Sequence, residues 1–200
     1  MLVIIEVWSW KGGCGKSSLS LSLAGGYAAR GFKVAIADMD EQQTCRTFFN
    51  NATDCPFEVF SGYPETSDYD YLIVDRSPER STDNLPLEIA DLVLVPILPS
   101  AIDAWSLLPA LEALDKRQIV KNRMIVVNRF QNNRSLMNDF LKNIEHDYVV
   151  MDRAIYSRTI ANYSTVFKPS GLSIFASGLK DAKNEINLLI NKIELSIKKN

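Results

Sequence analysis

The sequence predicts an α/β fold in which a doubly wound, mostly parallel sheet carries helices on both faces. Short apolar runs rich in β-branched residues recur along the chain, and each run is nearly continuous rather than alternating. Such runs are typical of strands that are buried on both faces of a sheet. Helix-like stretches separate them, and a glycine-rich loop follows the first run. This alternation favours crossover connections and a parallel sheet.

Five apolar runs are the strongest strand candidates. They are Leu2–Val7, Val34–Ala37, Tyr71–Val74, Leu92–Ile97 and Met124–Val127. Weaker candidates are Phe57–Phe60 and Tyr148–Met151.

Four stretches are expected to form helices. The first, Ser17–Arg30, stops at Gly31, a residue suited to a C-terminal cap. Gly25 and Gly26 weaken this prediction, because each costs about 1 kcal/mol relative to Ala in a helix. The other three are Ala104–Arg117 (with Pro109 as a kink site), Ser135–Glu145 and Leu179–Lys199.

The length of 200 residues is room for one domain of ordinary size. No repeat or Pro/Gly/Ser-rich linker divides the chain, so we expect residues 1–200 to form a single domain. The three cysteines form no CxxC pair, which favours a reducing cytoplasm over a disulfide scaffold. No stretch approaches the roughly 18 apolar residues of a membrane span, and no stable membrane association is expected.

The charge is divided unevenly along the chain. The net charge of −2 argues against a protein that coats nucleic acid by bulk charge. Residues 1–100 hold 7 Lys/Arg and 14 Asp/Glu, a net of −7, whereas residues 101–200 hold 15 and 10, a net of +5. The second half is therefore the place to look for a basic surface.

The most informative segment is SWKGGCGKSS at residues 9–18, which we call the phosphate loop. It stands directly after a predicted strand and opens a predicted helix. Glycines let the backbone curve so that several N–H groups point into one concavity, and the helix N-terminus adds further N–H donors. Lys16 is placed to reach the β- and γ-phosphates, and the Ser17 hydroxyl to hold Mg²⁺. These features predict a P-loop NTPase fold.

The loop departs from the common P-loop pattern in one respect. Trp10 stands where the pattern has Gly, and a second lysine, Lys11, heads the loop. This variant resembles the deviant Walker A ATPases of the ParA/MinD group. The resemblance continues through Val34–Gln42, Tyr69–Asp75 and Ala90–Ser100 in family order, and late in the chain through Arg158 and Val166-Phe167. Among these ATPases, the length is similar to that of the small ParF-like plasmid-partition ParA proteins.

The resemblance implies a site for ATP or ADP with Mg²⁺. Lys11 would cross to the phosphates of the partner subunit in an ATP-sandwich dimer, a role that stabilises charge on the transferring phosphoryl group. Asp40 would position or activate the attacking water. Asp38 and Asp75 would join Ser17 in holding Mg²⁺, mostly through water. The residues implied in nucleotide binding are Lys11, Gly12, Gly13, Cys14, Gly15, Lys16, Ser17, Ser18 and Asn128.

Asn128 is the one residue implied in nucleotide binding that lies outside the loop. Asn128 and Arg129 resemble an Asn-Arg pair that lines the adenine pocket in the MinD branch, but an Asn that caps a turn at a strand end is an equal alternative.

Two departures from the family pattern bear on hydrolysis. Glu41 stands where the family has Pro, and Arg76 follows Asp75, where it could bind anions or pair with Glu79.

The resemblance also implies partners and a place in the cell. The ATP-bound homodimer would bind DNA without sequence preference, and a ParB-like centromere-binding protein would stimulate hydrolysis, so the protein is expected to be cytoplasmic and nucleoid-associated. Basic side chains of the second half are candidates for phosphate contacts. They are Lys116, Arg117, Lys121, Arg123, Arg134, Arg153, Arg158, Lys168, Lys180 and Lys183.

Three further hypotheses fit the same residues. A MinD-like protein would use Leu179–Lys199 as a membrane-surface helix, although a helix packed on the sheet is favoured. A nucleotide-binding switch with negligible hydrolysis is suggested by Glu41 and Arg76. An ATPase of the same kind could position another cargo, such as a protein organelle.

Overall fold

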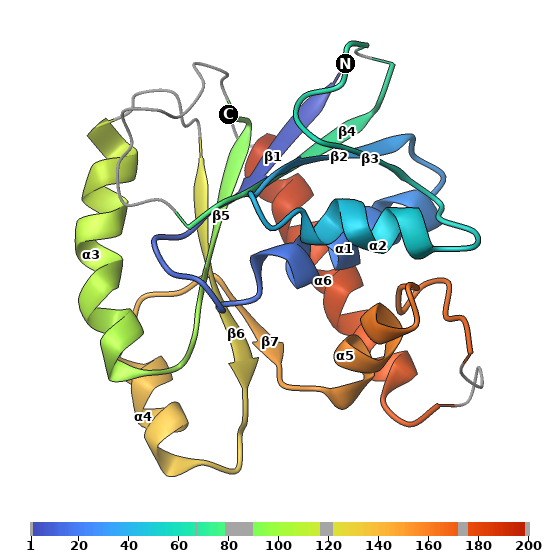
Figure 1. Ribbon diagram of the computed structural model, residues 1–200. Coiled ribbons are helices and arrows are strands. Elements are labelled where there is room, and N and C mark those ends of the chain that lie inside the picture. The colour runs from blue at the N-terminus through green and yellow to red at the C-terminus, as the bar shows by residue number, and fades with distance from the viewer. Residues whose placement is uncertain (1, 67, 79–89, 117–121, 172–175, 199–200) are drawn as a thin grey trace.

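The computed structural model describes residues 2–66, 68–78, 90–116, 122–171 and 176–198. Within these ranges seven strands form one sheet in the order β3-β2-β4-β1-β5-β6-β7 (Figure 1). Every pair of neighbouring strands runs parallel. The predicted doubly wound α/β fold is confirmed.

All seven predicted strands are present, with small differences at their ends. They are β1 (Val3–Val7), β2 (Val34–Met39), β3 (Glu58–Phe60), β4 (Tyr71–Arg76), β5 (Leu92–Ile97), β6 (Arg123–Phe130) and β7 (Tyr148–Met151). The strands β2, β4 and β6 extend beyond their apolar runs. In β2 and β4 the extension arises because Asp38 and Asp75 continue the ladder opposite one another.

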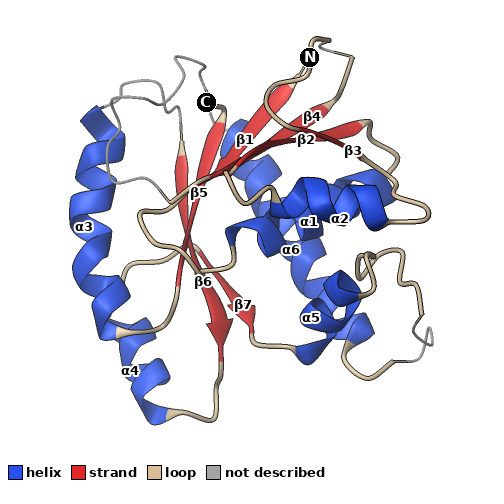
Figure 2. Cartoon of the chain, in the orientation of Figure 1, coloured by secondary structure: helices blue, strands red, loops and turns tan. Residues whose placement is uncertain are grey.

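Helices cover both faces of the sheet (Figure 2). One face carries α1 (Lys16–Ala29), α2 (Thr44–Asn51), α5 (Ala154–Ala161) and α6 (Leu179–Lys198). The other carries α3 (Ala101–Lys116) and α4 (Ser135–Asn143). The predicted helix ends Arg117 and Lys199 lie outside the described residues, and α3 runs through Pro109.

Two helices, α2 and α5, were not predicted from the sequence. Each has only 8 residues, and neither has a side-chain N-cap hydrogen bond. Packing holds them in place instead. Cys45 and Phe48 of α2 are buried in the core that covers the sheet. Ile155 of α5 is buried in a separate cluster that includes Leu179 and Ala182 of α6. Tertiary contacts therefore supply the stability that the local sequence of these two helices does not.

Gly25 and Gly26, which weakened the prediction of α1, allow close packing. A Cβ at Gly25 would lie 2.8 Å from the Thr165 hydroxyl oxygen, and one at Gly26 would lie 2.5 Å from the Ile190 Cδ1 of α6. The helix is buried on nearly every side, and Gly31 ends it with a φ of +89°. Gly26 thus lets α6 approach the helix that follows the phosphate loop, and Gly25 makes room for Thr165.

Candidate nucleotide-binding site

The phosphate loop connects the end of β1 to the first residue of α1, Lys16. Gly13 and Gly15 adopt positive φ angles of 81° and 88°, in the region that L side chains rarely enter. A Cβ at Gly15 would also lie 2.5 Å from the Asn128 Nδ2 atom. The sequence therefore needs Gly at position 15 for both backbone conformation and space.

The carbonyl oxygen of Lys11 organises the loop. It accepts hydrogen bonds from the Ser9 hydroxyl at 2.9 Å, the Lys16 Nζ at 3.0 Å and the Cys14 thiol at 3.5 Å. The Lys16 side chain is buried and folded back along the loop. Its ammonium group is thus held at the loop that would cradle phosphates.

Asn128 supports the loop from the end of β6. Its Nδ2 donates to the Cys14 carbonyl at 2.9 Å, and its Oδ1 accepts the Arg129 N–H at 2.9 Å. Cys14 is itself buried, with its sulfur 2.9 Å from the Ser9 hydroxyl. The structure thus brings Asn128 to the phosphate loop, and its contact with adenine stays a prediction.

Two buried carboxylates lie side by side next to the loop, on adjacent strands. Asp75 is fully buried and accepts hydrogen bonds from the Ser20 hydroxyl at 2.9 Å and the Cys45 thiol at 3.3 Å. Burial raises the pKa of Asp75 to about 6, against the opposing effect of hydrogen bonds from Ser17, Ser20 and Cys45. The site therefore holds a carboxylate whose ionised form is poorly solvated and would be stabilised by a cation.

Asp38 is held by the chain that follows β2. It accepts backbone N–H groups of Asp40 at 3.2 Å and Arg46 at 2.9 Å, and burial raises its pKa. The Asp40 carboxylate lies farther out and accepts the Gln42 N–H at 2.9 Å. The two Asp residues of this segment thus differ in place: one is buried beside Asp75, the other faces the cavity above the loop.

The donor set beside the loop suits Mg²⁺. The Ser17 hydroxyl and the carboxylates of Asp38 and Asp75 are oxygen ligands, which Mg²⁺ prefers, and it retains several of its waters in such sites. The Ser17 hydroxyl lowers the pKa of Asp75, so the hydroxyl and this carboxylate lie close to one another. These residues therefore fit the predicted cation.

Lys11, at the head of the loop, is paired within its own chain. Its Nζ lies 3.5 Å from a carboxylate oxygen of Asp103, near the start of α3. Asp103 and Ser100 also form a reciprocal cap, with the Ser100 hydroxyl 2.5 Å from the same carboxylate oxygen and the Asp103 N–H 3.2 Å from Ser100 Oγ. The lysine is thus held at the N-terminus of α3 rather than pointed into the phosphate cavity.

Arg76 turns away from the phosphate loop. Its guanidinium pairs with Glu6 at 3.5 Å and donates to the Tyr63 hydroxyl at 2.8 Å, and both charged side chains are buried. The observed ion pair of Arg76 is with Glu6, and the expected pair with Glu79 stays a prediction. Glu79 lies outside the described residues.

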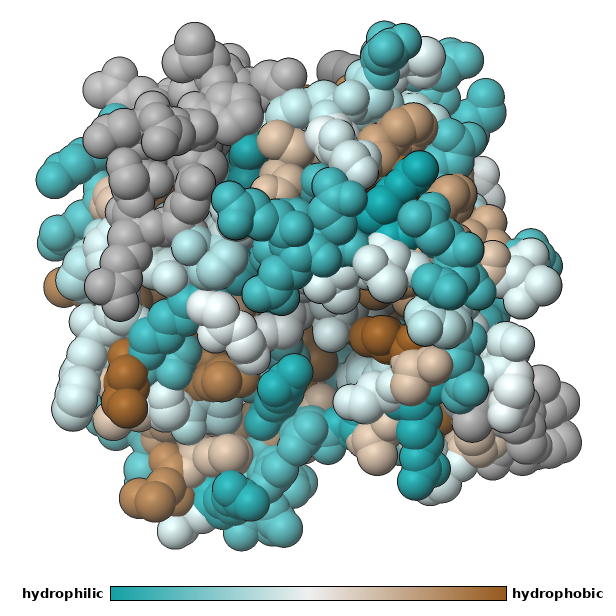
Figure 3. Space-filling view, in the orientation of Figure 1, coloured by the Kyte–Doolittle hydropathy of each residue, from teal (hydrophilic) through white to brown (hydrophobic). Residues whose placement is uncertain are grey.

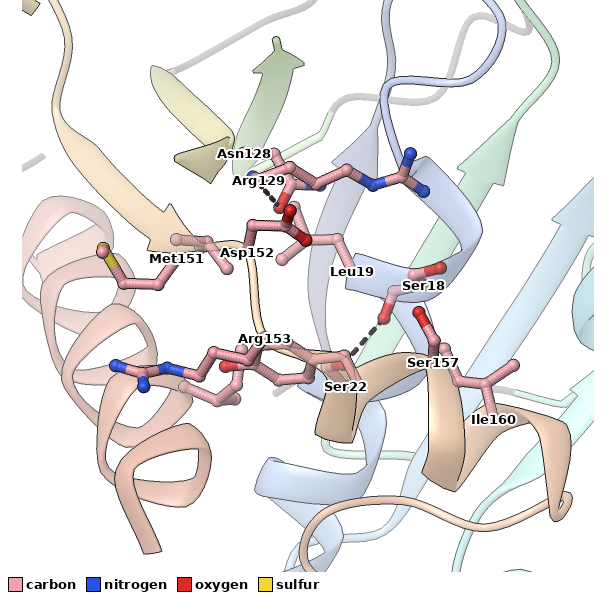
Figure 4. A pocket seen from close by; sticks show the side chains of 13 residues that line it. Ser18, Leu19, Ser22, Asn128, Arg129, Met151, Asp152, Arg153, Ser157 and Ile160 are labelled. Atoms are coloured by element: carbon pink, nitrogen blue, oxygen red, sulfur yellow. Dashed lines mark hydrogen bonds between the residues drawn. The ribbon is translucent and has the colours of Figure 1, made fainter. Parts of the chain in front are cut away.

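Two cavities meet beside the loop, and both are lined by Ser18 and Arg129. The phosphate cavity lies over the loop glycines, Lys16, Ser17 and Asp40. The second cavity, which we call the base cavity, is drawn in Figure 4, where side chains from α1, β6, β7 and α5 converge. One continuous surface therefore runs from the phosphate loop to the base cavity.

Sequence reasoning found only part of the base cavity. Asn128 and Arg129 enter it because β6 changes register after Val127 and Arg129 takes a φ of 55°. The remaining lining residues belong to no motif that we recognised. They are Leu19, Ser22, Val150, Met151, Asp152, Arg153, Tyr156, Ser157, Ile160 and Ile186.

The parallel sheet, the loop between β1 and α1, and the paired carboxylates define a P-loop nucleotide-binding protein. The family model described as the CobQ/CobB/MinD/ParA nucleotide binding domain matches residues 5–166. The chain therefore belongs to the ParA/MinD family of nucleotide-binding proteins, a family of ATPases whose members dimerise with ATP and work with partner proteins.

Three relatives show the range of this family. The maintenance of carboxysome distribution protein A of Halothiobacillus neapolitanus is 24% identical, over 94% of this chain and 95% of its own. A plasmid partition protein of Borrelia burgdorferi B31 bound to AMPPNP has a TM-score of 0.70 at 18% identity, covering 96% of this chain and 100% of its own. The septum site-determining protein MinD of Pyrococcus horikoshii OT3, complexed with Mg-ADP, has a TM-score of 0.67 at 13% identity, covering 97% and 98%.

Proposed function

We propose that the protein is a ParA-type ATPase of DNA partition, which closes as an ATP-dependent homodimer and binds DNA without sequence preference. The observation that carries the proposal is the phosphate loop with Lys11 at its head, placed beside the buried pair Asp38 and Asp75. This arrangement combines anion-binding backbone, two lysines and a cation site at one edge of the sheet.

The residues of the phosphate cavity have separate roles in the proposed hydrolysis. The N–H groups from Gly12 to Ser18 cradle the phosphates, and the Lys16 ammonium leaves the Lys11 carbonyl to bind the β- and γ-phosphates. Mg²⁺, when bound at Ser17, Asp38 and Asp75, neutralises phosphate charge. Asp40 faces the cavity and orients the attacking water by accepting a hydrogen bond from it.

Dimerisation requires that Lys11 change partners. In the structure its ammonium pairs with Asp103 at 3.5 Å. In the proposed dimer it crosses to the phosphates of the second subunit, where a cation stabilises the charge of the transition state. The ion pair with Asp103 then describes the resting monomer, and ATP competes with it for Lys11.

The DNA surface of this proposal is smaller than the sequence suggested. Arg123 pairs with Asp115, Arg153 with Asp181 and Glu185, and Lys168 with Asp54, while Arg117 and Lys121 lie outside the described residues. The candidates that form no ion pair among the described residues are Lys116, Arg134, Arg158, Lys180 and Lys183. Dimerisation doubles their number, which suits a chain of net charge −2.

The proposed stimulating partner has an apolar surface available on α3. Ile102, Trp105 and Leu108 lie on one face of this helix and are 64%, 75% and 65% exposed. Figure 3 shows apolar residues in brown at the left and lower left of the molecule, over α3 and α4. Asp103, which holds Lys11, lies in the same helical turn, so a protein docked there would contact the element that controls this lysine.

The test is nucleotide binding and phosphate release, measured with and without DNA for the wild type, Lys16→Ala and Lys11→Ala. We expect Lys16→Ala to lose nucleotide binding, and Lys11→Ala to bind nucleotide but to lose dimerisation and turnover. Equal nucleotide binding by the wild type and Lys16→Ala would contradict the loop assignment. Undiminished dimerisation of Lys11→Ala would contradict the sandwich dimer.

A second candidate keeps the ATPase and changes its cargo. The relative from Halothiobacillus neapolitanus, a protein that maintains carboxysome distribution, is the observation that favours cargo positioning. Affinity capture of partner proteins, with this protein held in its ATP-bound state as the bait, distinguishes this candidate from DNA partition. A centromere-binding protein supports partition, and a shell or adaptor protein of an organelle supports cargo positioning.

Positioning at a membrane surface has less support. In the parts of the chain that the structure describes, no helix has the length and apolar character needed to cross a bilayer. The helix α6 buries Ile186, Leu189, Ile190 and Ile193 in the core. Sedimentation with anionic vesicles and ATP tests membrane binding.

The remaining alternative is a nucleotide-binding switch without hydrolysis. Such a switch would release no phosphate in the presence of DNA and the partner protein.

A further inference from the structure

A buried carboxylate on α6 lies behind the base cavity without lining it. Glu185 is 8% exposed, and it belongs to the helix that packs against α1, β7 and α5. Burial raises its pKa, and the surrounding donors oppose that effect. A buried acidic group is costly unless it is fully hydrogen-bonded, so its partners indicate what it is for.

The partners of Glu185 come from the wall of the base cavity. One carboxylate oxygen accepts the Met151 N–H at 3.1 Å and lies 3.5 Å from the Arg153 guanidinium. The other accepts the Tyr156 hydroxyl at 2.7 Å. All three of these partners line the base cavity, and in Figure 4 the Arg153 side chain extends from the cavity toward α6.

Further contacts fix the same turn of α6 to the cavity wall. The Tyr148 hydroxyl donates to the Glu185 carbonyl at 2.8 Å, and the Tyr156 hydroxyl lies 3.3 Å from the Ala182 carbonyl. Ile186, the next residue of the helix, lines the cavity itself. One helical turn therefore sets the end of β7, the start of α5 and the loop between them.

We propose that Glu185 is a positioning residue for nucleobase recognition: it sets the wall formed by Met151, Arg153 and Tyr156 through one buried carboxylate. This inference rests on the proposed function, because it takes the base cavity as the place where a nucleotide base binds. The partners of the Glu185 carboxylate belong to β7, α5 and the loop between them, and the phosphate loop is a separate segment. Loss of this carboxylate is therefore expected to weaken recognition of the base and to leave recognition of the phosphates intact.

The test compares ADP with inorganic tripolyphosphate as calorimetric ligands of the full chain. For Glu185→Ala, buried donors lose their acceptor, and we expect ADP binding to weaken by about tenfold with tripolyphosphate binding unchanged. The preference for ADP over GDP should narrow as well. Tyr156→Phe, which removes one hydroxyl, should produce a smaller change in the same direction.

A matched control lies at the other end of the same helix. Glu194 pairs with Arg30 at 3.2 Å, away from the base cavity, and Glu194→Ala should leave both ligands unaffected. Glu185→Gln keeps the volume and one acceptor, so it remains informative if Glu185→Ala does not fold. Unchanged ADP binding in Glu185→Gln and Tyr156→Phe, or equal losses for ADP and tripolyphosphate, would overturn the inference. A wild type that binds neither ligand would overturn the proposed function itself, and this inference with it.

Discussion

The phosphate cavity and the base cavity are neighbours, but they are built in different ways. The phosphate cavity is formed largely by consecutive residues of one loop, whose glycines and backbone N–H groups determine its shape. The base cavity is formed by side chains from α1, β6, β7, α5 and α6, which are far apart in the sequence. A site made of backbone is visible as a motif, whereas a site made of converging side chains appears only in the fold.

The largest expected effect comes from Gly15→Ala in the phosphate loop. The added Cβ meets the Asn128 Nδ2 atom, and the residue must hold a φ of 88°. We expect tripolyphosphate binding to weaken by about 100-fold or more, as measured by calorimetry. Adding Asn128→Ala relieves the clash but also removes the donor to the Cys14 carbonyl. The double variant is therefore compared with Asn128→Ala alone, and the loss that remains measures backbone strain. Wild-type affinity in Gly15→Ala would contradict the loop geometry.

Asp75→Asn tests the cost of the buried carboxylate. The pKa of Asp75 is raised from its ordinary value of 3.8 to about 6, so the folded state retains a proton that the unfolded state has lost. The stability it contributes is full below pH 3.8 and is lost as the pH rises through 6. Asp75→Asn should therefore raise the free energy of unfolding at pH 7 by about 3 kcal/mol.

Urea denaturation between pH 4 and pH 8, without Mg²⁺ or nucleotide, measures this effect. The wild type should lose stability across the window relative to Asp75→Asn. Asp139→Asn, on the exposed face of α4, serves as the control and should follow the wild type. A variant no more stable than the wild type at pH 7 would show that the ionised carboxylate is fully compensated by its donors.

Cys45 gives a smaller effect at the same carboxylate. Its thiol donates to Asp75 at 3.3 Å from the first turn of α2, so it helps to orient this carboxylate toward Ser17. Cys45→Ala should raise the Mg²⁺ concentration needed for nucleotide binding by severalfold, and Cys45→Ser, which keeps a donor, should restore it in part. Cys55→Ala, at a half-buried cysteine outside both cavities, is the matched control. An identical Mg²⁺ requirement in all variants would remove Cys45 from the site.

The smallest expected effect comes from Asp103→Asn. The Lys11–Asp103 pair is partly exposed, with side-chain exposures of 29% and 10%, and pairs of this kind contribute little to stability. Freeing Lys11 should lower the protein concentration needed for dimerisation by about two- to threefold with a non-hydrolysable ATP analogue. Light scattering measures this change. Weaker dimerisation would show that Asp103 supports the dimer rather than restrains Lys11.

Much of the fold could be predicted because its signals are local. Buried parallel strands read as continuous apolar runs, and all seven were found. The helices α2 and α5 were missed because they are short and form through packing. Gly25 and Gly26 looked like defects of α1, since the sequence alone does not show that Thr165 packs against Gly25 and Ile190 against Gly26.

In the site, too, the features with local sequence signals could be predicted and those that depend on packing could not. The loop glycines, Lys16, Asp38 and Asp75 lie together where the sequence placed them, because the motif and the strand ends fix their positions. The pairing of Lys11 with Asp103 and the network of Glu185 link residues far apart in the chain. Contacts of this kind depend on how helices pack, and a single sequence does not encode them as a pattern.

The close packing of α6 at Gly26 has a practical consequence for handling the protein. Because α6 rests directly on α1, and α1 opens at the phosphate loop, a deletion within α6 removes support from the helix that carries Lys16. Shortened versions ending before Leu179 are therefore poor starting points for crystallisation or labelling. A reporter dye is better attached at an exposed position such as Asn143, at the end of α4, which lines neither the phosphate cavity nor the base cavity.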